Sequence, residues 1–258
     1  MQPSATSGPP PGEAQPVLEL TIIIPALNES RNVVTVVEES VAELARQQLD
    51  GRFEMILVDD GSTDDTGALM DELAKRFSQV TVIHHRTNLG FGAAQLSGFA
   101  RARGRFVTLL PSDGEIGVEQ AINLYRGIGD AELMVSERQA DSVEIQKQVR
   151  PAFRGVLSFG NRLLTRLILG FDLTGMEGIY VVRRDVLSSL DLSSKSGFLV
   201  PELIAKCHWR GYQIRRGVQR YYRTRLSGVS KVTNLRTVIK SFRDMIRLRL
   251  SMTFGRKK

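Results

Sequence analysis

Four polar loops follow four short apolar runs, and these loops carry the side chains that could do chemistry. The apolar runs span residues 20–24, 53–58, 80–84 and 106–110. The loops that follow them contain, in order, Pro25-Ala26-Leu27-Asn28-Glu29, Asp59-Asp60-Gly61-Ser62, Asn88-Leu89-Gly90-Phe91-Gly92 and Pro111-Ser112-Asp113-Gly114-Glu115. In open parallel sheets, ligands bind beyond the carboxyl ends of the strands. We therefore expect these four loops to meet at one edge and to form a binding site.

The second loop begins with two adjacent carboxylates, Asp59 and Asp60. A carboxylate at the end of a buried strand can accept hydrogen bonds from a base or a ribose. The alternative is that this loop only turns the chain and caps the next helix, as Asp, Gly, Ser and Thr commonly do. Capping explains residues 62–65 but does not explain two acids at the end of a strand, so we favour the ligand-binding interpretation.

The fourth loop places Asp113 and Glu115 two residues apart. Mg²⁺ is usually held by one or two carboxylates together with phosphate oxygens of the substrate. A Ser-Asp-Gly turn is also a common structural device. The residues alone leave both interpretations open.

Several other chemistries are disfavoured. Gly90 and Gly92 could let backbone approach a phosphate, but a dinucleotide fingerprint would need a third glycine where Gln95 stands. No P-loop sequence is present, and a single cysteine allows neither an intrachain disulfide nor a cysteine-based zinc site. His84 and His85 show no metal-binding spacing, and we interpret them as packing or solvated-loop residues.

The order of predicted elements favours an α/β fold. Strand-like runs, the fifth at 133–136, alternate with helix-like segments at 32–48, 66–77 and 93–102. Ser62, Thr63 and Asp64 are good helix-starting residues, and Gly104 is a good helix-ending one. This alternation predicts a mainly parallel sheet with helices on both faces. Further along, we expect helices at 153–169, 201–209 and 234–250 and a strand at 179–182, whereas 213–223 is mixed and basic.

The charge is sorted along the chain. The net charge is +7, but residues 201–258 hold 16 Lys and Arg against 2 Asp and Glu. The last quarter is therefore expected to face something anionic, such as nucleic acid, phosphate groups or a membrane surface. No apolar run is long enough to span a membrane. Residues 1–16 contain five prolines and no apolar segment, so we expect a disordered tail.

The four loops together resemble the family 2 glycosyltransferases. The strings that carry the resemblance are TIIIPALNES, MILVDDGSTDDT, NLGFGAAQLSGFARARG and FVTLLPSDGEI. Two later strings, FLVPELIAKCHWRGYQI and RTRLSGVSK, are similar to the subgroup that transfers a sugar to a polyprenyl or dolichyl phosphate, of which the dolichyl-phosphate mannose synthases are the best-known members. The resemblance covers roughly residues 18–232. It implies a nucleotide-diphosphosugar-binding, glycosyltransferase A-type fold, with a C-terminal amphipathic helix added.

The resemblance also implies roles for individual residues. Those matching the nucleotide-binding positions are Pro25, Asn28, Glu29, Asp59, Asp60 and Gly90. Asp113 matches a catalytic metal ligand and Glu115 a further ligand position, which implies Mg²⁺ or Mn²⁺ as cofactor. Arg138 and Arg225 match catalytic arginines. Residues matching the acceptor-phosphate positions are Arg154, Ser158, Ser230 and Lys231.

The sequence departs from the family pattern at one important position. Pro111 stands where the metal motif has its first acid, so the metal could be bound more weakly or held differently. No plausible general base is present, which fits an acceptor that is already a nucleophile. A lipid phosphate is largely dianionic at neutral pH, because the second pKa of a phosphate monoester is about 6.

The expected reaction is metal-dependent and inverting transfer of a sugar from a nucleoside-diphosphate sugar to a polyprenyl phosphate. We expect a donor-binding part at 17–136, an acceptor-binding part at 137–232 and a basic membrane-surface helix and tail at 233–258. The protein is then cytoplasmic and peripheral on the inner face of the membrane, a homodimer being possible. The alternatives are a family 2 enzyme with a saccharide acceptor and a non-catalytic nucleotide-sugar-binding protein. Nucleic-acid binding is disfavoured, because it gives the four loops no role.

Overall fold

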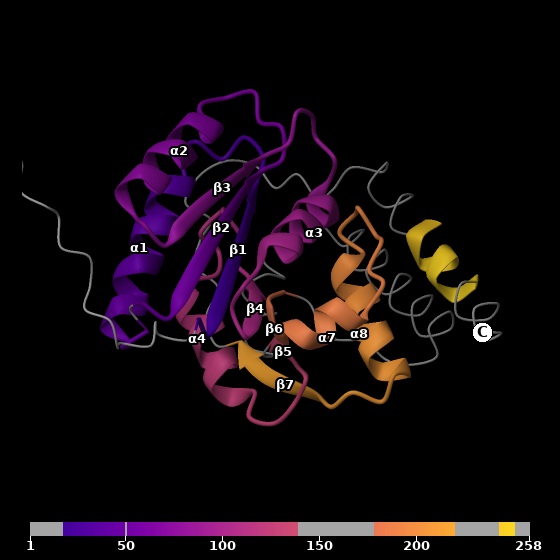
Figure 1. The fold of residues 1–258 in the computed structure, drawn as a ribbon. Helices are drawn as coiled ribbons and strands as arrows, with labels where there is room; N and C mark the ends of the chain where they lie inside the picture. The colour runs from indigo at the N-terminus through magenta and orange to yellow at the C-terminus, as the bar shows by residue number, and fades with distance from the viewer. Residues whose placement is uncertain (1–17, 50, 139–177, 220–242, 251–258) are drawn as a thin grey trace, which may run out of the picture.

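The computed structural model describes residues 18–49, 51–138, 178–219 and 243–250, and these residues form a seven-stranded sheet (Figure 1). The strand order is β3-β2-β1-β4-β6-β5-β7. Strand β6 pairs antiparallel with β4 and with β5, and the other neighbouring strands pair in parallel. The strands are β1 (Leu20–Ala26), β2 (Phe53–Asp59), β3 (Val80–His84), β4 (Phe106–Leu109), β5 (Leu133–Arg138), β6 (Tyr180–Arg183) and β7 (Ile214–Gln219).

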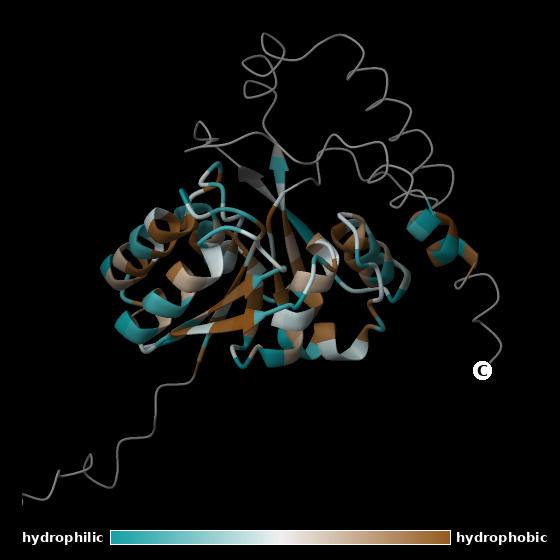
Figure 2. Cartoon of the chain, turned by 90° about the horizontal axis from the view of Figure 1, so that it is seen from above, coloured by the Kyte–Doolittle hydropathy of each residue, from teal (hydrophilic) through white to brown (hydrophobic). Residues whose placement is uncertain are grey.

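Helices cover both faces of this sheet (Figures 1 and 2). One face packs against α1 (Val33–Arg46), α2 (Thr66–Arg76) and α4 (Val118–Gly127). The other face packs against α3 (Phe91–Arg101), α7 (Arg184–Ser189) and α8 (Leu199–Trp209). The predicted α/β fold, a mainly parallel sheet with helices on both faces, is confirmed.

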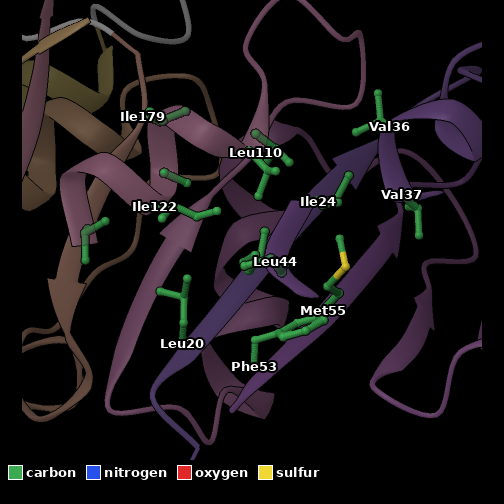
Figure 3. Packing of buried hydrophobic residues seen from close by; sticks show 14 of the residues in the cluster. Leu20, Ile24, Val36, Val37, Leu44, Phe53, Met55, Leu110, Ile122 and Ile179 are labelled. Carbon is green, nitrogen blue, oxygen red and sulfur yellow. The ribbon is translucent and has the colours of Figure 1, made fainter. Parts of the chain in front are cut away.

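The core follows the two-residue period of the strands. Along β1, Leu20, Ile22 and Ile24 point to the α1–α4 face, whereas Ile23 points to the α3–α8 face. Figure 3 shows Leu20 and Ile24 packing with Met55 and Leu44 on the first face. Since both faces of the central strands are buried, these strands read as continuous apolar runs.

Two features of the chain differ from the sequence expectation. Residues 213–223 looked mixed and basic, but β7 lies within them as an edge strand. Arg215 and Arg216 on β7 are exposed, and charges are common on edge strands because they discourage pairing with other chains. Helices α4 and α7 were not predicted.

The predicted helix ends are also corrected. Helix α3 ends at Arg101, so Gly104 is not its cap. A Cβ at Gly104 would lie 2.6 Å from the backbone nitrogen of Thr21, so a close approach of two backbones explains this glycine. The N-cap of α2 is Asp65, without a side-chain cap bond, and Asp64 accepts the hydrogen bond from the backbone N–H of Thr66 instead (3.1 Å).

The C-terminal part is described only at residues 243–250, which are helical. The predicted helix at 153–169 and the first part of the predicted helix at 234–250 lie outside the described residues, as does the predicted tail at 1–16. Within the described ranges, none of the helices has both the length and the apolar composition needed to cross a membrane.

Candidate active site

The carboxyl ends of β1, β2, β3 and β4 meet at one edge of the sheet, and side chains join the loops that follow them. The first two loops are held together at Asn28. Its backbone N–H donates to Ser62 Oγ at 2.9 Å, and its side-chain Oδ1 accepts from the backbone N–H of Thr63 at 2.8 Å. Asn28 adopts a left-handed backbone with φ of 51°, which asparagine tolerates better than most residues. Asn28 therefore orders both loops.

Glu29 lies in the same junction and is 9% exposed. Its backbone N–H donates to Thr66 Oγ1 at 2.8 Å, at the start of α2. Its carboxylate accepts a hydrogen bond of 2.6 Å from Asn32 Nδ2. The predicted nucleotide-contacting residue is thus held in a fixed orientation by protein partners.

The carboxylate of Asp60 binds the third loop to the second. Its Oδ1 accepts from the backbone N–H of Leu89 (2.9 Å) and contacts His85 Nδ1 (2.7 Å). Its Oδ2 accepts from the backbone N–H of Gly90 at 2.9 Å. These partners account for most of the hydrogen-bonding capacity of a carboxylate with about four lone-pair sites. Asp60 therefore fixes the loop that carries Gly90. Among the described residues Oδ2 accepts one hydrogen bond, which leaves it the capacity to accept a ligand N–H or O–H.

Asp59, the last residue of β2, is held from two sides. Its Oδ1 accepts from the backbone N–H of Ser62 at 2.9 Å, and its Oδ2 lies 3.1 Å from His84 Nδ1. Burial alone would raise the pKa of Asp59, but the Ser62 and His84 contacts outweigh burial and hold the pKa below its ordinary value. Asp59 is therefore an anion at neutral pH.

His84 bridges two carboxylates. Its Nε2 lies 3.0 Å from Asp71 Oδ1 on α2, and its Nδ1 contacts Asp59. The hydrogen bonds to Asp71 first, and to Asp59 second, raise the pKa of His84 above its ordinary value, against the opposing effect of burial. Protonated His84 can donate to both acids at once, so it links the start of the second loop to α2.

Gly61 allows the second and third loops to come into contact. It has a φ of 75°, and a Cβ there would lie 2.4 Å from the carbonyl carbon of Thr87. An L side chain would meet both backbone strain and a backbone clash. The glycine after Asp60 is therefore required by the close packing of two loops.

The fourth loop carries the predicted metal ligands. Ser112 is buried and donates to the carbonyl oxygen of Pro25 at 3.0 Å, which ties this loop to the end of β1. The carboxylates of Asp113 and Glu115 follow on a turn in which Asp113 Oδ1 accepts from the backbone N–H of Glu115 (3.1 Å), and both residues are partly exposed.

These two carboxylates fit a hard divalent cation. Mg²⁺ and Mn²⁺ favour oxygen ligands, and Mg²⁺ commonly takes one or two carboxylates together with substrate phosphates. Among the described residues, no group of three or more His, Cys, Asp or Glu side chains could hold a metal. The donor set therefore suits a cation that is shared with a phosphate-bearing ligand rather than a closed protein cage.

A separate cavity of about 320 Å³ lies behind the fourth loop, between α1 and the start of α4. It is lined by Val36 and Ser40 of α1 and by Gly114, Ile116 and Gly117. None of the predicted site residues lines it, so this cavity is not the expected donor site.

The strands beyond β4 bring further predicted residues towards the same edge. Strand β5 runs parallel to β4 through the antiparallel β6, and β7 runs parallel to β5. Arg138, the last residue of β5, is therefore placed at the edge by its backbone, as is Gln219 at the end of β7. The predicted residues Arg154, Ser158, Arg225, Ser230 and Lys231 lie outside the described residues.

Sequence reasoning missed the role of the two histidines. His84 and His85 are neither simple packing nor solvated-loop residues, since each contacts one acid of the Asp59–Asp60 pair. The order of the strands could have revealed these contacts. The two histidines stand at the end of β3 and the two acids at the end of β2, and the parallel pairing of these strands puts Asp59 opposite His84.

Comparison with known proteins decides the family. The model of the family described as glycosyl transferase family 2 matches residues 21–190. The chain belongs to glycosyl transferase family 2. This family 2 chain is 32% identical over 194 residues to the polyprenol monophosphomannose synthase of Mycolicibacterium smegmatis. The match covers 73% of this chain and 70% of the relative.

A second relative is a dolichyl-phosphate β-glucosyltransferase of Trichomonas vaginalis, which is 27% identical over 167 residues. That match covers 62% of this chain and 48% of the relative, so the family 2 chain spans about half the length of that protein. Both relatives are named for sugar transfer to a lipid phosphate.

A solved structure supports the fold of the family 2 chain. Glucosyl-3-phosphoglycerate synthase from Mycobacterium tuberculosis, crystallised with Mg²⁺ and uridine diphosphate, superimposes with a TM-score of 0.58 at 23% identity. The match covers 90% of this chain and 78% of the other. The expected glycosyltransferase A-type fold is thereby confirmed.

Proposed function

We propose that the chain transfers a sugar from a nucleoside-diphosphate sugar to a polyprenyl or dolichyl phosphate. The observation that carries the proposal is the match, over most of the chain, to the polyprenol monophosphomannose synthase, together with the four interlocked loops at the carboxyl edge of the sheet. Fold alone would not support this assignment, because one fold hosts many functions.

The donor nucleotide is proposed to bind over the first three loops. Asp60 has one position on Oδ2 that can accept a hydrogen bond from the nucleotide, and the loop that it fixes carries Gly90. Pro25, Asn28, Glu29 and Asp59 surround the same edge, and the hydrogen bonds described above hold three of them in place. A site that is ordered before the ligand arrives does not have to be ordered by the ligand.

The donor diphosphate is proposed to lie beside Asp113 and Glu115. These residues would hold Mg²⁺ or Mn²⁺, which supplies neutralisation of the charge on the departing nucleoside diphosphate. Pro111 stands where the family motif has its first acid, and its side chain provides no ligand oxygen. The site is therefore proposed to work with the two carboxylates of the loop.

The acceptor phosphate is proposed to attack the anomeric carbon without a general base. An oxygen of the lipid phosphate forms the new bond as the bond from carbon to the nucleoside diphosphate breaks, which inverts the anomeric configuration. Arginines suit the attacking phosphate because their forked donors match its oxygens. We assign Arg138 and Arg225 this catalytic role at the attacking phosphate. We propose that the same acceptor phosphate is bound by Arg154, Ser158, Ser230 and Lys231.

The topology supports this placement of the acceptor. Residues 139–177 leave the sheet after Arg138 and rejoin it before Tyr180, and residues 220–242 begin after Gln219. All three points lie at the edge that carries Asp113, because β6 is antiparallel to its neighbours. The two segments that hold the predicted acceptor residues are therefore attached beside the donor loops.

The proposed location is peripheral, on the inner face of the cytoplasmic membrane. The acceptor is a long lipid, so the active site has to reach the bilayer surface. The basic last quarter of the sequence, with 16 Lys and Arg against 2 Asp and Glu, provides attraction to anionic lipids. A homodimer is compatible with this arrangement.

The test is a transfer assay with radiolabelled UDP- and GDP-sugars and three acceptor conditions: a short polyprenyl phosphate, an oligosaccharide and no acceptor. We expect label in the organic phase only with polyprenyl phosphate and a divalent metal. Asp130→Asn, in an exposed turn at the opposite edge of the sheet, should behave as wild type and serves as a matched control for Asp113→Asn.

The other outcomes discriminate the alternatives. Label in the oligosaccharide fraction would replace the lipid acceptor with a saccharide. Nucleotide-sugar binding without turnover of any donor would favour the non-catalytic protein. The loss of a metal ligand at Pro111 would then explain the missing activity. Retention of the anomeric configuration would contradict the single displacement.

A further inference from the structure

The exposed apolar side chains of the described residues fall into two segments. The large hydrophobic residues that are exposed there are Leu89 (45%), Phe91 (42%), Ile246 (39%) and Leu250 (51%). Leu89 and Phe91 lie at the start of α3, on either side of Gly90. Ile246 and Leu250 lie on the helical segment 243–250. Scattered apolar residues need no explanation, so the question is whether these four belong to one surface.

Direct contacts join the two segments through the loop before α8. Gly92 donates its backbone N–H to the carbonyl oxygen of Lys195 at 3.2 Å, and a Cβ at Gly92 would lie 2.4 Å from the carbonyl oxygen of Ser194. Ser194 Oγ and Ser196 Oγ donate in turn to Asp244 Oδ2, at 2.9 and 2.7 Å. We call residues 194–196 the serine loop. The start of α3, the serine loop and the segment 243–250 therefore lie side by side, as Figure 1 shows.

The segment 243–250 has an inner and an outer face. Met245 and Leu248 are buried against Phe198 and Ala205 of the α8 region. The outer face consists of residues at positions i, i+3, i+4 and i+7, namely Arg243, Ile246, Arg247 and Leu250, all exposed. Ile246 therefore shares its face with Arg243 and Arg247 rather than with the buried Met245. Figure 2 shows both hydrophilic and hydrophobic residues on this segment.

The segments that form this surface carry exposed basic side chains. Arg243, Arg247 and Lys195 are exposed, and the acid beside them, Asp244, accepts hydrogen bonds from the two serines. Exposed apolar side chains can enter the lipid of a membrane surface while neighbouring cations meet anionic headgroups, and an arginine can keep its charged end in water above its apolar stem.

We infer that Leu89, Phe91, Ile246 and Leu250, together with Lys195, Arg243 and Arg247, form one surface that docks on an anionic lipid bilayer. This bilayer surface rests on the proposed function, and it adds to it that the donor loop itself meets the membrane. Gly90, between the two apolar residues, donates to Asp60, so the nucleotide site would lie directly above the headgroups.

The test measures binding of the full chain to vesicles, without donor or acceptor, by co-sedimentation at low salt. Wild type should bind vesicles of phosphatidylcholine with phosphatidylglycerol and should bind much less to phosphatidylcholine alone. Each of Arg243→Ser and Arg247→Ser should weaken binding about fivefold, since a basic residue near an anionic surface contributes about that factor. Arg46→Ser, an exposed arginine on α1 across the molecule, is the matched control and should bind as wild type.

Two double variants give the decisive comparison. One combines Leu89→Ser with Phe91→Ser, and the other combines Ile246→Ser with Leu250→Ser. Both double variants should lose binding to the anionic vesicles. If the Leu89 and Phe91 variant binds as wild type, the inferred surface is wrong, even if the helix alone binds. Circular dichroism of each variant excludes unfolding as the cause of a loss.

A transfer assay separates this inference from the proposed function. With a short polyprenyl phosphate in detergent, the Ile246 and Leu250 variant should keep wild-type transfer while failing to bind vesicles. No transfer by the wild type, with vesicle binding intact, would overturn the proposed function and leave the bilayer surface standing. If the wild type transfers sugar but does not bind vesicles, the bilayer surface is overturned and the proposed function stands.

Discussion

Each acid at the end of β2 has a histidine of its own. His85 Nδ1 contacts Asp60 at 2.7 Å, and its Nε2 lies 2.8 Å from Ser97 Oγ on α3. The side chains of His85 and Asp60 are 8% and 5% exposed. A buried carboxylate needs hydrogen-bond partners, and His85 supplies one to Oδ1, the oxygen that also accepts from the backbone N–H of Leu89. His85 is thus a positioning residue for Asp60.

Replacing His85 should weaken nucleotide binding through Asp60. His85→Leu removes the donor to Asp60, and we expect binding of UDP or GDP to weaken about tenfold, the usual worth of a hydrogen bond to a charged group. His85→Asn retains an N–H donor near the Nδ1 position and should recover most of the affinity. Calorimetry on the folded variants measures both effects. Equal loss in the two variants would show that His85 acts only by filling space.

His84 makes stability depend on pH. Its folded-state pKa is raised above the ordinary 6.5 by Asp71 and then Asp59. A raised folded-state pKa stabilises the fold fully below the unfolded-state pKa, and this contribution is lost as the pH rises through the folded-state pKa. Thermal unfolding should therefore show His84→Asn to be less stable than wild type on the acidic side of 6.5. The difference should shrink at alkaline pH, and a gap independent of pH would contradict this.

At the scale of elements, the serine loop before α8 is packed between two helices. It contacts α3 through Gly92 and the segment 243–250 through Asp244. Glu202 of α8 fixes the same loop by accepting from the backbone N–H of Ser194 at 2.8 Å. Lys206, one turn further along α8, forms an ion pair of 2.7 Å with Glu202. The position of the C-terminal helical segment is therefore coupled to the donor side of the molecule.

Gly92→Ala tests this packing. A Cβ would lie 2.4 Å from Ser194 O and 2.5 Å from Ser196 O, both backbone atoms that cannot move alone. Alanine normally favours a helix over glycine by about 1 kcal/mol. Here we expect instead a loss of about 1–3 kcal/mol, as for other overpacked sites. Denaturant unfolding measures it, with Gly197→Ala, where a Cβ meets nothing within 4 Å, as control. A gain at Gly92 would contradict the packing.

Sequence alone predicted the elements that obey simple periods. The apolar strands β1 and β2 and the helix α1 were predicted because both sheet faces and one helix face are buried. Strand β7 was missed because its exposed arginines hide the pattern of an edge strand. Asp59, Asp60 and Asp113 could be selected as candidates because they follow predicted strands, and the parallel pairing of β1 with β2 and β4 puts their loops at one edge of the sheet. Their roles stay predictions. The roles of His84, His85 and Asp244 could not be found, because they depend on which loops lie side by side.

At the scale of the whole molecule, the sheet gathers the proposed functions at one edge. The donor loops follow β1 to β4, and the segments with the predicted acceptor residues are attached beyond β5, β6 and β7. The inferred bilayer surface extends from the third donor loop to residues 243–250. This arrangement would let a lipid-borne phosphate approach a bound sugar nucleotide from the membrane, without a segment that crosses it in the described part of the chain.

The central claim is tested most directly by mass spectrometry of the lipid after a reaction with unlabelled sugar nucleotide and a short polyprenyl phosphate. The account predicts a lipid heavier by one sugar residue and an equal amount of released nucleoside diphosphate. Asp113→Asn should lower both by about a hundredfold or more, because it removes a ligand of the ion that neutralises the leaving group, while Asp130→Asn should match wild type. Nucleoside diphosphate released without a heavier lipid, or a heavier lipid formed equally well by Asp113→Asn, would contradict it.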